Sequence, residues 1–208
     1  MGTASNARGD RANNTAAGFF ANASGDDSNN TATGTSSNAS GSNSRNVAAG
    51  FSANASGNGG ANTASGFFSN ASGGDSNGDG VGSFNTATGN LANANGNESR
   101  NVATGSGANA SGGDINGDGL GSANVATGRA SNASGNDSQN FAGGAQSDAR
   151  GNNSSNVALG NGATATGDGT SNIPERLSSH TRSGELPAVV LTSSGDHVPT
   201  SSSRFAMT

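Results

Sequence analysis

The sequence predicts an all-β fold, a parallel β-roll or β-solenoid of about ten 16-residue turns with two strands in each turn. Three observations support this fold. Gly recurs every sixteen residues, a second Gly follows each of these by seven, and Ala stands two positions before nearly all of them. One such unit cannot bury its own apolar face, so the units must stack on their neighbours.

The Gly spacing sets the frame of the array. The first series is Gly2, Gly18, Gly34, Gly50, Gly66, Gly89, Gly105, Gly128, Gly144 and Gly160, and the second runs from Gly9 and Gly25 to Gly151 and Gly167. Two of the spacings are 23 residues in place of 16. The extra seven residues predict two insertions, near residues 74–82 and 113–121, in a repeat array that spans residues 1–172.

The first half of each unit is predicted to form a short strand. Asn stands four positions before the first Gly in nine units, from Asn14 and Asn30 to Asn156, and Ala stands two before it, from Ala16 to Ala158. The residue between them is nearly always Thr or Val, and β-branched residues favour strands. Because side chains alternate along a strand, Asn and Ala share one face and Thr or Val the other.

The second half repeats the pattern as Ala-Asn-Ala-Ser-Gly or Ser-Asn-Ala-Ser-Gly, for example at residues 21–25 and 131–135. This predicts the second strand of each turn. Stacked Asn side chains are expected to form hydrogen-bonded ladders, and Gly to permit a positive φ at each corner. Apolar groups on both faces of the roll predict that its outer face self-associates.

Composition leaves disorder as an alternative. Phe, Ile, Leu and Val make up only 24 of the 208 residues, a share typical of disordered chains. However, the net charge is only −5, and low-complexity linkers do not keep a 7 + 9 rhythm. A disordered low-complexity segment therefore stays open beside the solenoid.

Residues 173–208 break the rhythm and contain Pro174, Pro187 and Pro199, so we expect an irregular, disordered C-terminal tail. The apolar stretch at 186–191 could be one strand or the product of a shifted reading frame. At the other end, Gly2 and Gly9 are already in phase, so we expect the chain to be a fragment of a longer array.

Other features exclude several functions. Nine Arg and no Lys are spread singly along the chain, which argues against nucleic acid as a partner. No apolar run is long enough for a membrane-spanning helix, and no signal peptide is evident. Cys is absent, and His180 and His197, the two His, lie in the tail. With no base beside a nucleophile, we expect no enzyme and no required cofactor.

The segment Asn153-Ser-Ser-Asn-Val-Ala-Leu-Gly-Asn-Gly-Ala-Thr-Ala-Thr-Gly167 resembles the YadA-like head repeats of trimeric autotransporter adhesins. Residues 45–50, 100–105 and 123–128 are weaker copies of its Asn-Val-Ala-x-Gly core. The resemblance covers residues 1 to about 172. Repeats of that family are nearer fourteen residues, and the two extra residues here fall in the connector from the second Gly to Asn, such as residues 25–30.

This resemblance implies a left-handed β-roll, a homotrimer, and a place on the bacterial cell surface at the outer membrane, or outside the cell. It also implies cell adhesion in virulence, by binding to extracellular matrix or cell-surface ligands. The tail carries neither a coiled-coil stalk nor a membrane anchor of that family.

The two insertions resemble the opening of a Ca²⁺ loop. Oxygen ligands stand at the first, third and fifth positions, followed by Gly at the sixth; the candidate ligands are Asp75, Asn77, Asp79, Asp114, Asn116 and Asp118. Ser83 and Ser122 are ninth, whereas Thr86 and Val125 stand at the twelfth position, where a bidentate Glu belongs. The alternatives are weak calcium binding, as in a secreted structural repeat protein, or solvated loops rich in Asp, Asn and Gly.

Overall fold

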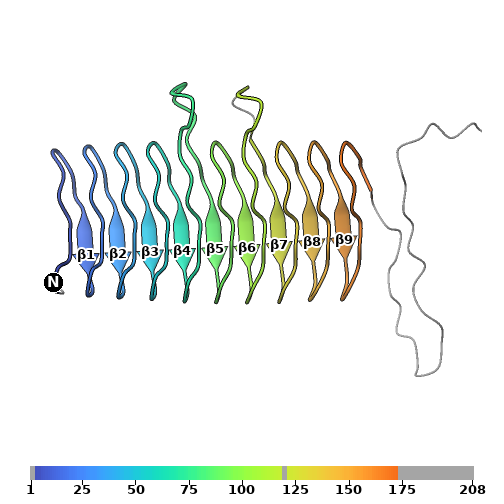
Figure 1. Ribbon diagram of the computed structural model, residues 1–208, viewed down its shortest axis with the longest axis horizontal. Helices are drawn as coiled ribbons and strands as arrows, with labels where there is room; N and C mark the ends of the chain where they lie inside the picture. The colour runs from blue at the N-terminus through green and yellow to red at the C-terminus, as the bar shows by residue number, and fades with distance from the viewer. Residues whose placement is uncertain (1–2, 119–120, 173–208) are drawn as a thin grey trace, which may run out of the picture.

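The computed structural model describes residues 3–118 and 121–172. Within them, nine three-residue strands form one parallel sheet in sequential order (Figure 1). The strands are β1 (Thr15–Ala17), β2 (Thr31–Thr33), β3 (Val47–Ala49), β4 (Thr63–Ser65), β5 (Thr86–Thr88), β6 (Val102–Thr104), β7 (Val125–Thr127), β8 (Phe141–Gly143) and β9 (Val157–Leu159). Each strand belongs to one coil of a solenoid, and the coils are numbered 1 to 9 after their strands. The predicted β-solenoid is confirmed, and the regular coils argue against the disordered alternative. The predicted tail, residues 173–208, lies outside the described residues.

Neighbouring strands pair over all three residues, and the central Ala always faces the central Ala of the next coil, as Ala32 faces Ala48. The step is 16 residues, except from β4 to β5 and from β6 to β7, where it is 23. Because the long coils keep this register, their extra residues leave the sheet as two loops that project from one edge (Figure 1).

The second half of each coil does not form the second strand that the sequence predicts. It contributes one residue to a column of isolated parallel bridges, such as Asn22 with Asn38. The physical reason is length: only five residues, 21–25 in coil 1, lie between the two turns on this side, compared with six, 28–33, on the next strand side. Each coil is therefore flattened, with a strand side, a bridge side and a turn at either end.

The interior is narrow and contains no large apolar side chain. Among the described residues, every buried hydrophobic residue is Ala, and the predicted inward faces of Asn and Ala are observed. Inner Asn side chains connect three coils. In coil 2, the Nδ2 of buried Asn30 donates to the Gly41 carbonyl at 2.7 Å, and its Oδ1 accepts from the Asn46 N–H at 3.0 Å. No buried side-chain N or O of the described residues lacks a partner.

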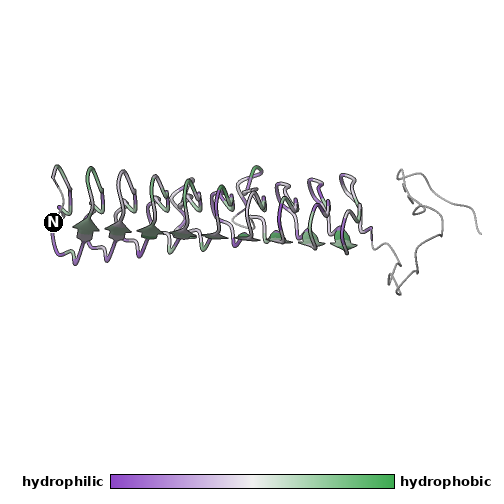
Figure 2. Ribbon diagram, turned by 90° about the horizontal axis from the view of Figure 1, so that it is seen from below, coloured by the Kyte–Doolittle hydropathy of each residue, from purple (hydrophilic) through white to green (hydrophobic). Residues whose placement is uncertain are grey.

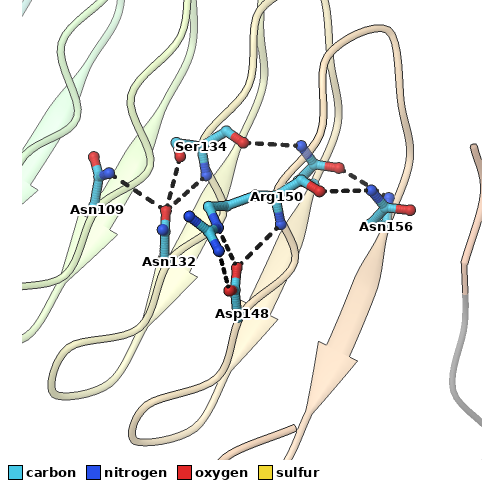
Figure 3. Close-up of polar contacts among 7 residues, drawn as sticks. Asn109, Asn132, Ser134, Asp148, Arg150 and Asn156 are labelled. Atoms are coloured by element: carbon cyan, nitrogen blue, oxygen red, sulfur yellow. Dashed lines mark hydrogen bonds and ion pairs between the residues drawn. The ribbon is translucent and has the colours of Figure 1, made fainter. Parts of the chain in front are cut away.

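A second Asn ladder runs along the bridge side, half-exposed. Each Nδ2 donates to the Oδ1 of the next coil at 3.1 to 3.3 Å, from Asn6 through Asn132. In coil 8, Asp148 replaces the Asn, and its carboxylate pairs with Arg150, whose Nε and Nη2 each lie 2.8 Å away (Figure 3). The expected ladders thus exist, and the outer one accommodates a charge because it is open to solvent.

Gly is required at the turn after each strand because the coils stack closely. A Cβ built on Gly34, whose φ is +128°, would lie 2.5 Å from the carbonyl oxygen of Gly50. Two residues after this Gly, the chain adopts a left-handed conformation in every coil. Gly107 and Gly162 occupy this position in coils 6 and 9, whereas Phe20, Phe68 and Leu91 occupy it in coils 1, 4 and 5.

Candidate functional site

The outward side of the sheet is a flat, repetitive surface. The first and third residues of each strand point away from the buried central Ala and form two columns with a step of about 4.8 Å between coils. Most members are Thr, Val, Ala or Ser, and Figure 2 shows the strands side by side in one row. Phe141 and Leu159 are the large exceptions near the C-terminal end. Apart from these two, the side chains of the two columns are small, and all of them are uncharged.

The residue two positions before each strand extends this surface by a third column. Phe84 stands in coil 5 and Arg100 in coil 6, and the Arg100 guanidinium lies 6.0 Å from the centre of the Phe84 ring. This distance is at the limit of a cation–π contact. With Arg45, which stands two residues before β3, they are large side chains in this column.

The first insertion loop folds around its own carboxylates. The Asp75 carboxylate accepts from the N–H groups of Gly78 and Gly80 at 2.6 and 2.9 Å. The Asn77 Oδ1 accepts from the Asp79 N–H at 3.0 Å, and Asp79 Oδ1 from the Val81 N–H at 2.7 Å. The three candidate ligands of this loop therefore lie together and hold its backbone.

The second loop repeats this arrangement. Asp114 Oδ1 accepts from the N–H groups of Asn116 and Gly117 at 3.0 and 2.7 Å, and Asn116 Oδ1 accepts from the Asp118 N–H at 2.9 Å. Its sixth residue, Gly119, lies outside the described residues. Both loops thus place the oxygens of their first and second candidate ligands, at loop positions one and three, against their own backbone.

The structure adds an acidic residue to each loop that the sequence analysis did not identify. Glu98, from the next coil, is buried; it accepts from the Ser76 N–H and hydroxyl at 2.9 and 2.6 Å and from the Asn77 amide at 3.4 Å. Asp137 stands in the same relation to the second loop and accepts from the Ile115 N–H at 3.2 Å. Each acidic residue follows the first ligand of its loop by 23 residues, and that spacing was the available signal.

The Asp137 carboxyl has a raised pKa. Burial is the main cause, because it disfavours the charged form, and the nearby Asp114 and Asp118 carboxylates add to the rise. The hydrogen bond from the Ile115 N–H acts in the opposite direction. The second loop is therefore a site where negative charges crowd together.

The ninth and twelfth loop positions supply no ligands. Ser83 and Ser122 are buried, and their hydroxyls donate to the carbonyls of Gly96 and Gly135 at 2.9 and 2.7 Å. Thr86 and Val125 are the first residues of β5 and β7. Over residues 3–118 and 121–172, no group of three or more Asp, Glu or His side chains is arranged to hold a metal ion.

A polar groove of about 720 Å³ runs beside the second loop, across coils 5 to 9. Its lining is composed of Asn, Ser, Gly and Asp residues together with Arg150 and Thr166. A smaller groove of about 420 Å³ continues it beside the first loop and shares Asn95 and Asn97 with it. These grooves offer hydrogen-bonding groups along the solenoid rather than a closed cavity.

The two His residues, His180 and His197, lie outside the described residues. In the described part of the chain, no helix has the length and apolar character to cross a bilayer. No family model, curated protein or solved structure matches the chain.

Proposed function

We propose that this chain is the head of a cell-surface adhesin, which binds extracellular matrix or other cells through its repetitive β-roll surface and catalyses no reaction. The observation that carries the proposal is the outward sheet side, where small uncharged residues repeat in register across nine coils. A repeated surface suits many weak contacts, because linked sites multiply modest affinities. The resemblance of residues 153–167 to adhesin head repeats supports the same reading.

The proposed assembly is a homotrimer on the bacterial cell surface, with the sheet sides of three chains facing one another. Val102 and Val125 form part of this side in adjacent coils, and Val47 and Phe141 are exposed there. Contact between chains would remove these apolar groups from water, which stabilises an assembly by about 25 cal/mol per Å². The turns and grooves would remain available for ligands.

Adhesion is tested with beads that carry the full chain, applied to films of fibronectin, collagen and laminin and to cultured mammalian cells. We expect binding above that of beads coated with albumin. Sedimentation equilibrium tests the trimer. Val102→Arg with Val125→Arg should abolish the trimer, whereas Ser106→Arg, at an exposed turn of coil 6, should leave it intact. Absence of bead binding on every surface contradicts the adhesin, and a wild-type monomer contradicts the trimer.

A second candidate function is a calcium-binding structural repeat of a secreted protein. The observation that favours it is the acidic residue that reaches each insertion loop from the next coil, Glu98 or Asp137, because it could supply the carboxylate missing at the twelfth position. A bound Ca²⁺ would neutralise the clustered carboxylates and join two coils. Its test is a calcium titration, described in the Discussion.

A further inference from the structure

A row of exposed apolar side chains occupies one end of the flattened coils. They stand on the turn after the strand, at the edge opposite the insertion loops in Figure 1. Between 45% and 59% of each side chain is exposed; the members are Phe19, Phe20, Phe51, Phe67, Phe68 and Leu91. We call this row the Phe ridge. It covers coils 1, 3, 4 and 5, and coil 2 interrupts it with Thr35 and Ser36.

The second residue of this turn is left-handed in every coil, whatever its type. Phe20, Phe68 and Leu91 have φ values of +55°, +51° and +55°, and Gly107 and Gly162 have +67° and +66°. A large residue is rare in this left-handed region, where each instance costs on the order of 1 kcal/mol or more. The other coils place smaller or polar residues there: Ser36, Ser52, Ala130 and Gln146. The size and apolar character of the side chains, and not the backbone, therefore distinguish the ridge from the same turn in other coils.

The ring arrangement indicates the kind of partner. Phe51 and Phe67 stack with centroids 5.3 Å apart and an interplanar angle of 17°, and Phe68 meets both of them edge-on. The rings of Phe51, Phe67 and Phe68 therefore form one apolar cluster across coils 3 and 4. Such an exposed cluster suits contact with another apolar surface.

The area of the ridge matches a small protein interface. A free Phe side chain exposes roughly 200 Å², so six half-exposed residues present about 600 Å². Two ridges in contact would bury about 1,200 Å², the lower end of the range for specific complexes. A lipid surface is a poorer partner, because the chain carries a net charge of −5 and no Lys, and anionic bilayers repel it.

We propose that the Phe ridge binds the Phe ridge of a second copy of this chain, with the two solenoids antiparallel and the two-fold axis at coil 3. In this arrangement coil 2 faces coil 4 of the partner, so the small Thr35 and Ser36 receive the bulky Phe67 and Phe68. Coil 1 faces coil 5, which joins Phe19 and Phe20 to Leu91. The ridge is therefore complementary to itself in one orientation.

The contact is self-limiting. The same turn carries Ser106 and Gly107 in coil 6, and small or polar residues in coils 7 to 9 apart from the stem of Arg129. Apolar contact therefore ends after coil 5, and each ridge pairs with one other ridge. This contact uses a turn and leaves the sheet side free, so it does not depend on the proposed trimer or on adhesion.

The test uses the full chain carrying Val102→Arg and Val125→Arg, so that association through the sheet side is absent. Sedimentation equilibrium then reports association through the ridge. Phe67→Thr with Phe68→Ser converts the turn of coil 4 to the sequence of coil 2, Gly-Thr-Ser-Ser, which this fold already accommodates. We expect the dimer dissociation constant to rise at least about tenfold, the factor that corresponds to about 1.4 kcal/mol.

The reverse change distinguishes pairing in one register from non-specific apolar association. Thr35→Phe with Ser36→Phe fills the gap that receives the partner's coil 4, so we expect a weaker dimer although the apolar area has grown. A tighter dimer would contradict the antiparallel register. An unchanged dissociation constant in the coil 4 variant would overturn the role of the ridge.

Disulfide formation gives the register directly, because the chain has no Cys. Ser52→Cys, in coil 3, lies at the two-fold axis and should cross-link to its own copy under mild oxidation. Ser36→Cys, in coil 2, should not, because two coils separate the copies. Equal cross-linking of both variants would overturn the antiparallel pair. A monomer whose ridge binds phosphatidylcholine vesicles would assign the ridge to lipid and also overturn it.

Discussion

The inner Asn column should contribute far more to stability than the outer ladder, and coil 2 offers a matched pair to measure this. Asn30 is fully buried and makes four hydrogen bonds: its amide donates to the carbonyls of Gly41 and Ser24, and its Oδ1 accepts from Ser44 and Asn46. Asn30→Ala leaves the Asn46 N–H buried without its partner, whereas the Gly41 carbonyl still accepts from the Ser44 hydroxyl.

The unpaired N–H costs about 1 to 3 kcal/mol, and the cavity left by the amide adds about 1 kcal/mol. We therefore expect Asn30→Ala to lower the free energy of unfolding by about 2 to 4 kcal/mol. Asn38→Ala removes one residue of the outer ladder, where water can replace the lost bonds to Asn22 and Asn54. Its expected cost is about 1 kcal/mol or less.

The assay is urea unfolding followed by far-UV circular dichroism, with both variants compared to the wild type. Asn30→Asp provides a further comparison, because it keeps the shape but replaces the amide donors with a buried charge; we expect it to be at least as destabilising as Asn30→Ala. Equal losses for Asn30→Ala and Asn38→Ala would refute the reasoning, since they would mean that burial of the inner column carries no extra free energy.

Three further predictions concern the turns and loops. Gly34→Ala should destabilise by at least about 2 kcal/mol because its Cβ meets the next coil, whereas Gly162→Ala, with no atom within 4 Å, should cost about 1 kcal/mol; urea unfolding distinguishes them. Without calcium, Asp137 in the folded state binds its proton more tightly than in the unfolded state. The protonated Asp137 therefore contributes stability at low pH. This contribution is lost as the pH rises from the ordinary Asp pKa of 3.8 through the raised pKa of the folded state. At pH 7, Asp137→Asn should therefore be more stable than the wild type. Calcium should raise the melting temperature and shift the amide signals of residues 75–82 and 114–121, and Glu98→Gln should weaken the effect at the first loop only.

A specific result would contradict each of these three predictions. Equal destabilisation by the two Gly variants would mean that the close approach of coils is not limiting. A wild-type stability that rises with pH across the Asp137 range, with no difference from Asp137→Asn, would contradict the stated charge crowding. A calcium titration that moves neither the melting temperature nor the loop signals would exclude both calcium sites.

Much of the fold was predictable because each coil repeats the same steric demands. The corner Gly and the Ala two positions before it are forced by coils that lie about 4.8 Å apart, so their spacing predicts the stack directly. The prediction of a second strand was wrong because the alternation of residue types does not reveal that the turns on either side leave only five residues between them.

The candidate site was less predictable. The loop ligands could be identified from their local order, but Glu98 and Asp137 reach the loops from the next coil, and a twelve-residue motif contains no information about that coil. The Phe ridge had a signal in the Gly-Phe-Phe repeats at residues 18–20 and 66–68. What the sequence could not indicate was that Phe20 and Phe68 adopt a left-handed backbone and point outward.

The Ala-filled interior has a consequence for the thermodynamics of this protein. Unfolding exposes few apolar atoms beyond methyl groups, while it exposes many amides and backbone groups. Apolar exposure raises the heat capacity and polar exposure lowers it, so the heat-capacity change on unfolding should fall below the usual 12 to 15 cal/mol/K per residue. The curve of stability against temperature then becomes broad and shallow. The free energy of unfolding of the solenoid should therefore be nearly the same in the cold as at 37 °C. In a protein with a conventional core, the free energy of unfolding has already passed its maximum at 37 °C.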